Sequence, residues 1–271
     1  MVHVSDQVVY LMETTGLPLS VICFLGHLFV FHLGCFLFEV MDQSGWLLDY
    51  KEFRGDQRRY WALLPQVCFN QFFILLPSMY LCEKLGVAFD SIDSRQQQLR
   101  QTIWHYLFYA VWMTIGHDIF FYLGHRFLLH SSWGYQLLQH DLHHSTKASI
   151  ALSSMYMAPS DYVLEICVPY LVPLCMLKAD AAFHFVAIAL GSLGGMYEHS
   201  GYNFCPYFPG LSTMAHGMHH TRYNCSFSDG VGSSNLMDGL FRTSYECVYP
   251  KWSGKKSIRE SKDAQCTYGL N

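Results

Sequence analysis

The stretch LPLSVICFLGHLFVFHLGCFLFEV, residues 17–40, decides the fold class of this chain. It is long enough for a helix that crosses a bilayer core of about 30 Å, which takes about 20 residues. Residues 61–82 and 102–124 are two further apolar stretches of similar length. Residues 161–197 are apolar but too short for two full crossings, so we expect a helical hairpin that turns near residues 178–180. The sequence therefore predicts an all-α integral membrane protein with about three to four transmembrane helices plus this hairpin.

The composition fits that prediction. Of the 271 residues, 51% are hydrophobic and only 14% are charged, whereas soluble domains average about 25% charged residues. The formal net charge of -4 argues against a nucleic-acid-binding protein, which is usually basic. The 10 cysteines include no C-x-x-C pair, and we expect those in apolar runs to be buried, reduced thiols. The length suits one domain or one membrane unit.

Lysine and arginine residues give an orientation, because cytosolic loops carry an excess of them. Residues 1–16 contain none, residues 41–60 contain four and residues 83–101 contain three. With three crossings, the N-terminus lies outside the cytosol and the loop 41–60 lies inside it. Residues 125–160 and 198–271 are then expected in the cytosol too.

Nine histidines stand in three clusters and one isolated position. Two clusters have the pattern H-x-x-H-H, and in a helix the residues i, i+3 and i+4 share one face. We therefore expect each cluster to project three rings together, so that two facing tripods could enclose two metals. His125 and His130 are five residues apart, about 140° around an ideal helix, which predicts a helix end or a distortion between them. The nine are His125, His130, His140, His143, His144, His199, His216, His219 and His220.

A metal site explains this concentration of histidines better than packing does. One histidine on an apolar face is usually a satisfied core residue. Nine packed together would repel one another on protonation and leave many ring nitrogens without partners. Nine ligands are too many for one ion and suit two. Imidazole binds zinc, copper, iron and nickel, and the lack of obvious cysteine ligands disfavours a structural zinc site. Two redox metals at a membrane surface would suit oxygen activation.

Residues 117–243 resemble the sterol desaturase/fatty acid hydroxylase superfamily of membrane di-iron oxidases. The ordered set of motifs carries this resemblance, since H-x-x-H-H alone is only moderately specific. The matching segments are Asp118-x-x-Phe121-Tyr122-x-x-His125-Arg126, His140–His144, His199-Ser-Gly-Tyr-Asn-Phe204, His216–His220 and Asp238-Gly-Leu-Phe-Arg-Thr243.

Within the superfamily, the sterol enzymes are the most similar. HSGYNF, at 199–204, and HHTRYNCSF, at 219–227, resemble the cholesterol 25-hydroxylase and C-4 methylsterol oxidase types. Three positions depart from that pattern. Pro206 comes one residue later than expected, Ser226 stands where an Asn is common, and Met237 stands where a Trp is common. These departures concern the substrate more than the chemistry.

The resemblance implies a monooxygenase that hydroxylates a C–H bond of a sterol, using O2 and electrons from NAD(P)H that arrive through a reductase and cytochrome b5. It implies two iron ions, for which zinc can substitute, held by the nine histidines. It also implies the endoplasmic reticulum membrane, with a histidine-rich helical cap that faces the cytosol. A fatty-acyl or other lipid hydroxylase or desaturase is the alternative in the same class. A metal-binding membrane transporter or sensor is the alternative in another class, although its ligands should lie near the middle of the spans.

Six other residues near these motifs are candidates for supporting roles. Three carboxylates could hydrogen-bond a ligand ring and orient it, and three polar residues could line the substrate mouth. The carboxylates are Asp118, Asp141 and Glu198, and the polar residues are Tyr202, Asn203 and Asn224.

The remaining histidines are weaker candidates. His184 would lie about 22 Å from the ligand end of a helix over 181–199, and His117 is not aligned with the first cluster, so both are expected to be structural. The same holds for the histidines of the early spans, His27, His32 and His105. Along the chain we expect an N-terminal transmembrane region over 1–116, a di-iron region over 117–243 and a polar tail over 244–271.

Overall fold

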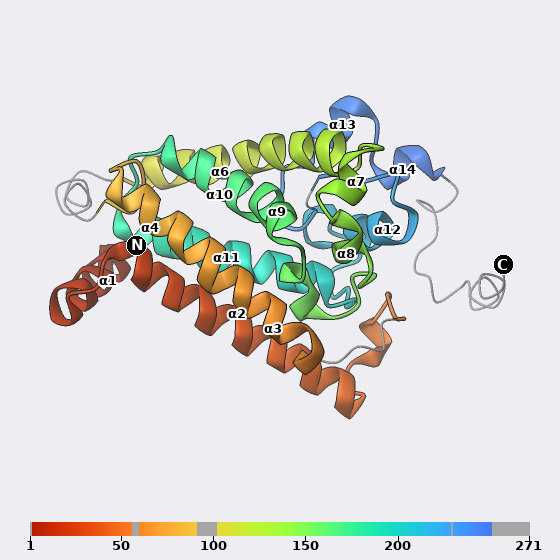
Figure 1. Ribbon diagram of the computed structural model, residues 1–271, viewed down its shortest axis with the longest axis horizontal. Coiled ribbons are helices and arrows are strands. Elements are labelled where there is room, and N and C mark those ends of the chain that lie inside the picture. The colour runs from red at the N-terminus through yellow and green to blue at the C-terminus, as the bar shows by residue number, and fades with distance from the viewer. Residues whose placement is uncertain (1, 56–59, 91–101, 229, 251–271) are drawn as a thin grey trace.

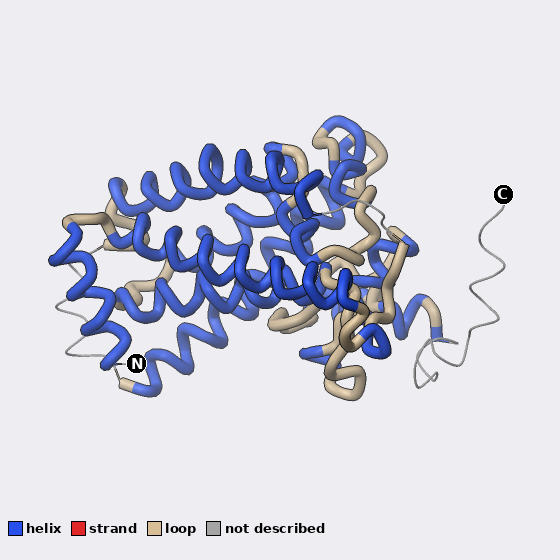
Figure 2. The backbone as a smooth tube through the Cα atoms, turned by 90° about the horizontal axis from the view of Figure 1, so that it is seen from below, coloured by secondary structure: helices blue, strands red, loops and turns tan. Residues whose placement is uncertain are grey.

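The computed structural model describes residues 2–55, 60–90, 102–228 and 230–250. Over these residues the chain is helical and contains no β-strand, only one isolated antiparallel bridge. Long helices form a bundle, and short helices gather at one end of it (Figure 1, Figure 2). The prediction of an all-α chain is therefore confirmed.

Two long helices have both the length and the apolar composition of membrane spans. They are α2, Leu19–Ser44, and the continuous helix Tyr60–Lys84, which comprises α3 (Tyr60–Asn70), the π-helical η2 (Gln71–Leu75) and α4 (Leu76–Lys84). The third expected helix also forms, as α6 (Ile103–Gly124), which has 22 residues. The number of crossings stays a prediction.

The outer faces of these helices carry large apolar side chains. Phe29 of α2, Phe73 of η2 and Trp104 of α6 are 69%, 71% and 75% exposed. Soluble monomers rarely expose large contiguous apolar patches, whereas such surface suits contact with lipid. The apolar helices and their outer faces therefore fit a membrane protein.

The predicted orientation and the tail fall partly on residues that the structure does not describe. Arg58, Arg59, Arg95 and Arg100, on which the orientation depends, lie outside the described residues, as do residues 251–271. The expected boundary between residues 116 and 117 falls inside α6, so no break in the helix accompanies it.

The expected hairpin is present, and its turn lies where the sequence predicts it. The first arm comprises α9 (Pro159–Tyr162), the π-helical η5 (Val163–Cys167) and α10 (Val168–Cys175), and the second arm is α11 (Ala181–His199). The Asp180 carboxylate begins α11 by accepting a hydrogen bond from the Phe183 N–H at 2.9 Å, as an N-cap residue does. α10 packs on α6 and α11 packs on α2, which brings the hairpin into the bundle.

Two of the π-helical segments end two residues before a proline. Pro77 follows η2 and Pro169 follows η5. A proline cannot donate the i→i−4 hydrogen bond, and its ring clashes with that carbonyl. A local change to i→i−5 bonding accommodates it. In η5 this wider turn contains Glu165, a buried carboxylate.

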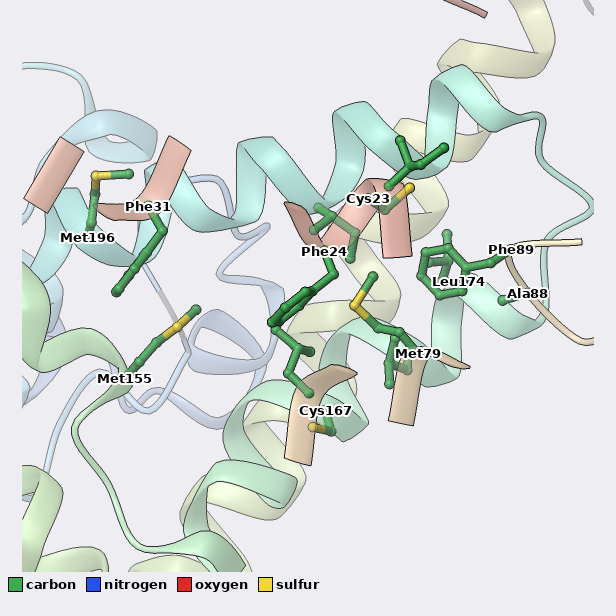
Figure 3. Close-up of a cluster of buried hydrophobic side chains, with 14 of the residues drawn as sticks. Cys23, Phe24, Phe31, Met79, Ala88, Phe89, Met155, Cys167, Leu174 and Met196 are labelled. Carbon is green, nitrogen blue, oxygen red and sulfur yellow. The ribbon is translucent and has the colours of Figure 1, made fainter. Parts of the chain in front are cut away.

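The hydrophobic core lies between the long helices. Figure 3 shows Phe24 and Phe31 of α2, Met79 of α4, Leu174 of α10 and Met196 of α11 in one cluster. Each of the five is at most 1% exposed. Side chains from four helices therefore hold the bundle together and fix the ends from which the short helices start.

The short elements occupy the end of the bundle where α6 and α11 finish, and α1 (Val2–Thr15) lies at the opposite end (Figure 1). They are η1 (Leu48–Tyr50), η3 (His125–Leu129), α7 (Gly134–Leu137), α8 (His140–His144), η4 (Ala151–Met155), η6 (Pro209–Leu211), α12 (Met214–Arg222), α13 (Leu236–Phe241) and α14 (Tyr245–Val248). The histidine clusters lie on or beside these elements.

Candidate metal centre

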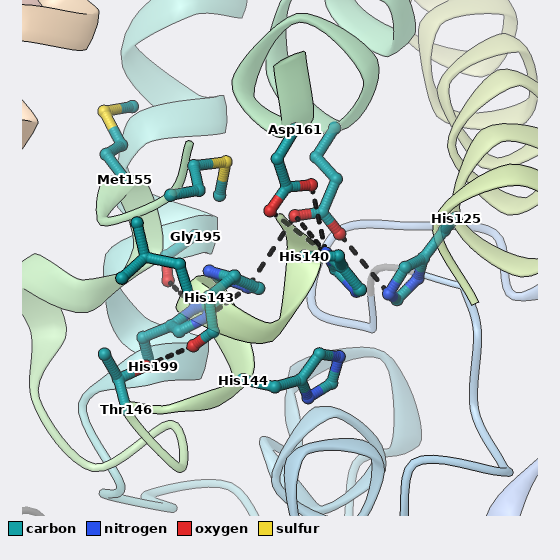
Figure 4. A network of polar contacts seen from close by, with 12 residues as sticks. His125, His140, His143, His144, Thr146, Met155, Asp161, Gly195 and His199 are labelled. Atoms are coloured by element: carbon teal, nitrogen blue, oxygen red, sulfur yellow. Dashed lines mark hydrogen bonds and ion pairs between the residues drawn. The ribbon is translucent and has the colours of Figure 1, made fainter. Parts of the chain in front are cut away.

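The structure brings the nine histidines into two adjoining groups. In each group the potential ligand atoms all lie within 4.8 Å of one another. The first, which we call the five-histidine group, is His125, His130, His140, His144 and His219, and the second, the four-histidine group, is His143, His199, His216 and His220. All are buried except His130, which is partly buried. Figure 4 shows five of the nine rings side by side.

A π-helical segment explains how His125 and His130 meet. η3 runs from His125 to Leu129, and the His130 N–H donates to the His125 carbonyl at 2.9 Å. This i→i−5 bond marks a π-turn, in which residues five apart come onto one face. The two ring centroids are 4.8 Å apart. The predicted distortion between these residues is confirmed.

Each H-x-x-H-H cluster is divided between the two groups. On α8, the i and i+4 residues His140 and His144 join the five-histidine group, and His143 joins the four-histidine group. On α12, His216 and His220 join the four-histidine group and the i+3 residue His219 joins the other. The expected facing tripods are therefore wrong. Each helix instead contributes two rings to one group and one ring to its neighbour.

Backbone carbonyls fix the tautomer of three rings. A carbonyl can only accept, so a ring nitrogen beside it must donate. The Nδ1–H groups of His125, His219 and His199 donate to Phe227, Cys225 and Gly195 carbonyls at 2.9, 2.8 and 3.2 Å. Because these rings are neutral, each Nε2 keeps its lone pair and faces the centre of its group.

The spacing of the Nε2 atoms fits ions between them. Six Nε2–Nε2 pairs within the two groups are 3.0 to 3.3 Å apart. Two nitrogens bound to one ion at 2.0–2.1 Å, at the angles of octahedral or tetrahedral coordination, lie about 2.8 to 3.4 Å apart. Among the described residues, His220 has no hydrogen-bond partner on either ring nitrogen. Such orphaned buried nitrogens are costly, and an ion would satisfy them.

Burial keeps the rings in the form that binds metal. It lowers the pKa of all nine histidines, and that of His219 to about 4. Neighbouring rings lower most of them further. Neutral imidazole is the ligand form, so the rings are ready for a cation at neutral pH.

Two buried carboxylates at this centre were not predicted. The His140 Nδ1–H lies 3.0 and 3.1 Å from the two Asp161 oxygens. Glu165 Oε1 lies 3.3 Å from His125 Nε2, and its Oε2 lies 3.7 Å from His143 Nε2. Figure 4 shows Asp161 beside the His140 ring. The available signal was that these are the two acidic residues of the otherwise apolar run 159–177, since ionisable groups there are expensive and usually functional.

The carboxylates predicted to orient ligand rings make other contacts. Asp118 Oδ2 accepts hydrogen bonds from Ser234 Oγ and Leu236 N–H, both at 2.6 Å. It therefore ties the start of α13 to α6, and does not orient a ligand ring as predicted. Asp141 is exposed, so the orienting role expected for it is wrong too. Glu198 is buried and accepts a hydrogen bond from the Val231 N–H, which joins α11 to that loop.

Asp238 supports two ligand rings through the backbone. Its carboxylate accepts from the N–H groups of Phe227 and Ser228 at 3.0 and 2.9 Å. The same loop presents the Phe227 and Cys225 carbonyls that hold two ligand rings. Ser226 in this loop has φ of +52°, a left-handed conformation in which Asn is enriched. That conformation explains why Asn suits this position.

An apolar cavity opens beside the four-histidine group, with about 690 Å³ of empty space when the open solvent at its mouth is counted. Its lining includes a stripe along α11, at Ile188, Gly191, Ser192 and Gly195, that leads to His199 at the end of that helix. His143, His216 and Glu165 close the same end, and side chains of α2, α6, α10 and η4 complete the wall. The cavity therefore runs from the bundle core to the candidate metal centre.

The residues predicted for the substrate mouth do not line this cavity. Tyr202 is buried and its hydroxyl donates to Asp42 at 2.9 Å. The Asn203 amide donates to Ser212 Oγ at 3.2 Å, and exposed Asn224 accepts from the Tyr249 hydroxyl. These residues join loops together, and their role at the substrate mouth stays a prediction.

The other histidines have partners in the bundle. His184 Nε2 accepts from the Phe89 N–H at 3.1 Å and its Nδ1–H donates to the Asp180 carbonyl. His27 and His32 join a hydrogen-bonded chain through Gln71, His105 caps α6 with Thr102, and His117 packs on Tyr170 with ring centroids 4.4 Å apart. These contacts agree with the expected structural roles.

Comparisons with known proteins bear on the same part of the chain. The family model "Fatty acid hydroxylase" matches residues 110–243. A Mycosarcoma maydis protein named fatty acid hydroxylase ahd1 is 28% identical over 221 residues, which cover 76% of this chain and 53% of that protein. A Macaca fascicularis protein named fatty acid hydroxylase domain-containing protein 2 is 26% identical over 151 residues, or 56% of this chain and 42% of that protein.

The chain spans about half the length of these curated relatives. No solved structure matches it significantly. The family match covers the part that contains every histidine of both groups, Asp161, Glu165 and Asp238. Residues 110–243 therefore resemble the fatty acid hydroxylase family over the part of the chain that holds the candidate metal centre.

Proposed function

We propose that this chain is a membrane di-iron oxygenase that hydroxylates a C–H bond of a lipid. One observation carries the proposal: two buried histidine groups with the nitrogen spacing of metal ligands lie at the end of an apolar cavity. The match of residues 110–243 to the fatty acid hydroxylase family supports the reaction type. A transporter would hold its ligands near mid-span, whereas these groups lie at one end of the bundle (Figure 1).

The cavity suits an apolar substrate that extends along α11. Ile188, Ser192, Gly195 and His199 follow one face of that helix, and the distance from the first to the last is about 16 Å at 1.5 Å per residue. A lipid bound here would present one carbon to the four-histidine group, while its apolar body would contact Phe31, Leu171 and their neighbours.

Each part of the centre has a separate task. The nine histidines would hold two iron ions, which when bound supply the activation of dioxygen. Asp161 orients the His140 ring, and the loop at Asp238 orients the rings of His125 and His219. The apolar walls of the cavity exclude water from the reacting carbon and hold the substrate in register.

For the substrate, we propose a sterol, because the segments at 199–204 and 219–227 are similar to those of sterol enzymes. A fatty-acyl substrate is the second candidate, favoured by the printed names of the two relatives. For electrons, we propose NAD(P)H through cytochrome b5 and its reductase, and for location the endoplasmic reticulum with the centre facing the cytosol. The family resemblance supports the donor, and the excess of Lys and Arg in loop 41–60 supports the orientation.

Lipid profiling of a host strain tests the proposal. The strain would contain cytochrome b5 and express the wild type, His143→Ala or His105→Ala at equal levels. His105 is exposed at the start of α6 and controls for loss of a histidine. We expect an oxidised lipid with the wild type and His105→Ala and none with His143→Ala. The lipid class of the product separates a sterol from an acyl substrate, and a wild-type profile equal to that of the empty host would contradict the proposal.

A further inference from the structure

The geometry points to Glu165 as a carboxylate ligand shared by the two metal ions. This inference rests on the proposed function, because it presumes that both histidine groups hold an ion. Glu165 is 2% exposed and lies at the end of the cavity. Glu165 lies outside both H-x-x-H-H boxes, in the first arm of the hairpin.

Each carboxylate oxygen faces a different group. Oε1 lies 3.3 Å from Nε2 of His125, which belongs to the five-histidine group. Oε2 lies 3.7 Å from Nε2 of His143, which belongs to the four-histidine group. The first distance falls within the spacing of two ligands on one ion, about 2.8 to 3.4 Å. The second is slightly longer than that spacing. Glu165 therefore spans the two groups.

A cation would account for the contact with His125. The Nδ1–H of His125 donates to the Phe227 carbonyl, so the Nε2 of the neutral ring carries a lone pair. That lone pair faces Glu165 Oε1, and two acceptors at 3.3 Å repel each other unless a positive charge lies between them. An ion in the five-histidine group would be bound by both atoms and would remove the repulsion.

Charge balance gives a second reason. Two Fe2+ ions bring four positive charges into a buried site, and nine neutral imidazoles bring none. Uncompensated buried charge is strongly unfavourable. Asp161 compensates one side through His140, whereas Glu165 is placed between the groups and can compensate both ions directly.

The local helix geometry brings the two carboxylates to the same ring. Asp161 lies in α9 and Glu165 four residues later in the π-helical η5, and one oxygen of each lies within 4.8 Å of the other and of a ring nitrogen of His140. π-Segments occur frequently at functional sites. Here the wider turn before Pro169 contains a carboxylate that lies among apolar neighbours such as Ile166 and Leu171. A carboxylate without a cation would be costly in such surroundings.

Iron binding by the full-length chain tests this inference. The wild type, Glu165→Gln, Glu165→Asp and Glu39→Gln would be purified in lipid nanodiscs, loaded anaerobically with 57Fe2+ and titrated with a ferrous chelator. Glu39→Gln is the matched control, because Glu39 is a buried carboxylate of α2 that bonds to Gln43 outside the centre. Mössbauer spectra would report each iron separately, and circular dichroism would report folding.

We expect Glu165→Gln to weaken the binding of both ions by roughly 10-fold or more, the size typical of lost support at a metal site, and to change both Mössbauer doublets. Glu165→Asp keeps the charge and should recover part of the affinity, while Glu39→Gln should match the wild type. Wild-type affinity and spectra in folded Glu165→Gln would overturn the inference, as would a change in one doublet alone. A wild type that binds no iron would instead refute the proposed function.

Discussion

At the scale of single residues, the nitrogen that faces a metal is set by the partner of the other ring nitrogen. For His125 and His219 that partner is a backbone carbonyl of the loop 225–228, and for His140 it is the Asp161 carboxylate. Only the Asp161 contact can be removed by a change of side chain without altering the backbone. It is therefore the sharpest single-residue test of the idea that buried partners orient the ligands.

Asp161→Asn should weaken iron binding by roughly 10- to 100-fold while the chain stays folded, because the amide is a poorer acceptor for the His140 N–H. Chelator competition on the purified chain measures this. Asp141→Asn is the matched control, since Asp141 stands next to His140 but is exposed. Equal affinities for the two variants would show that Asp161 does not orient the ring.

The residues that the sequence predicts best are those with a local pattern. The nine histidines lie in short boxes whose spacing is visible without a structure, and the structure gathers all nine. Asp161 and Glu165 depend on how the hairpin packs against α8, which no short pattern encodes. Tyr202, Asn203 and Asn224 are near the clustered histidines in sequence, yet their side chains bond to Asp42, Ser212 and Tyr249, away from the cavity. Nearness along the chain therefore identified the clustered histidines but not the residues that line the cavity.

At the scale of elements, the turn that joins η3 to α7 positions His130. Gly134 begins α7 in a space without room for a side chain. A Cβ there would lie 1.9 Å from the Leu128 carbonyl oxygen and 2.7 Å from Ser131 Oγ. Because the obstacle is backbone, the turn itself would have to move, and His130 stands within it.

Gly134→Ala should therefore lower the thermal stability, at a cost of about 1–3 kcal/mol for the added methyl group, and weaken iron binding in the five-histidine group. Thermal unfolding and the Mössbauer doublets of the loaded chain measure the two effects. Gly210→Ala in η6 is the control, since a Cβ there meets nothing within 4 Å. A Gly134→Ala chain as stable as the control, with unchanged spectra, would disprove this role for the turn.

Element boundaries followed from the sequence where local chemistry sets them. The hairpin turns at the Asp180 cap, as its polar residues predict, and the five-residue spacing of His125 and His130 predicts the distortion that appears as a π-turn. The division of each H-x-x-H-H box between two groups did not follow, because it depends on the angle at which α8 and α12 approach each other. That angle is set by packing across the bundle end and not by either box alone.

At the scale of the whole molecule, the apolar runs and the histidine boxes, which are separate in sequence, line one site. The apolar helices line a cavity, and histidines of the boxes lie at its end. The apolar runs and the boxes were both visible in the sequence, whereas their meeting at His143, His199 and His216 required the fold. This arrangement would place an apolar substrate and a metal pair in contact while water is excluded.

The iron content of the purified full-length chain tests this account most directly. After anaerobic loading with 57Fe2+ and removal of free metal, elemental analysis gives iron per chain and Mössbauer spectroscopy resolves the environments. The account predicts two iron ions per chain in two histidine-rich environments. A folded chain that retains one ion, or none, would contradict it.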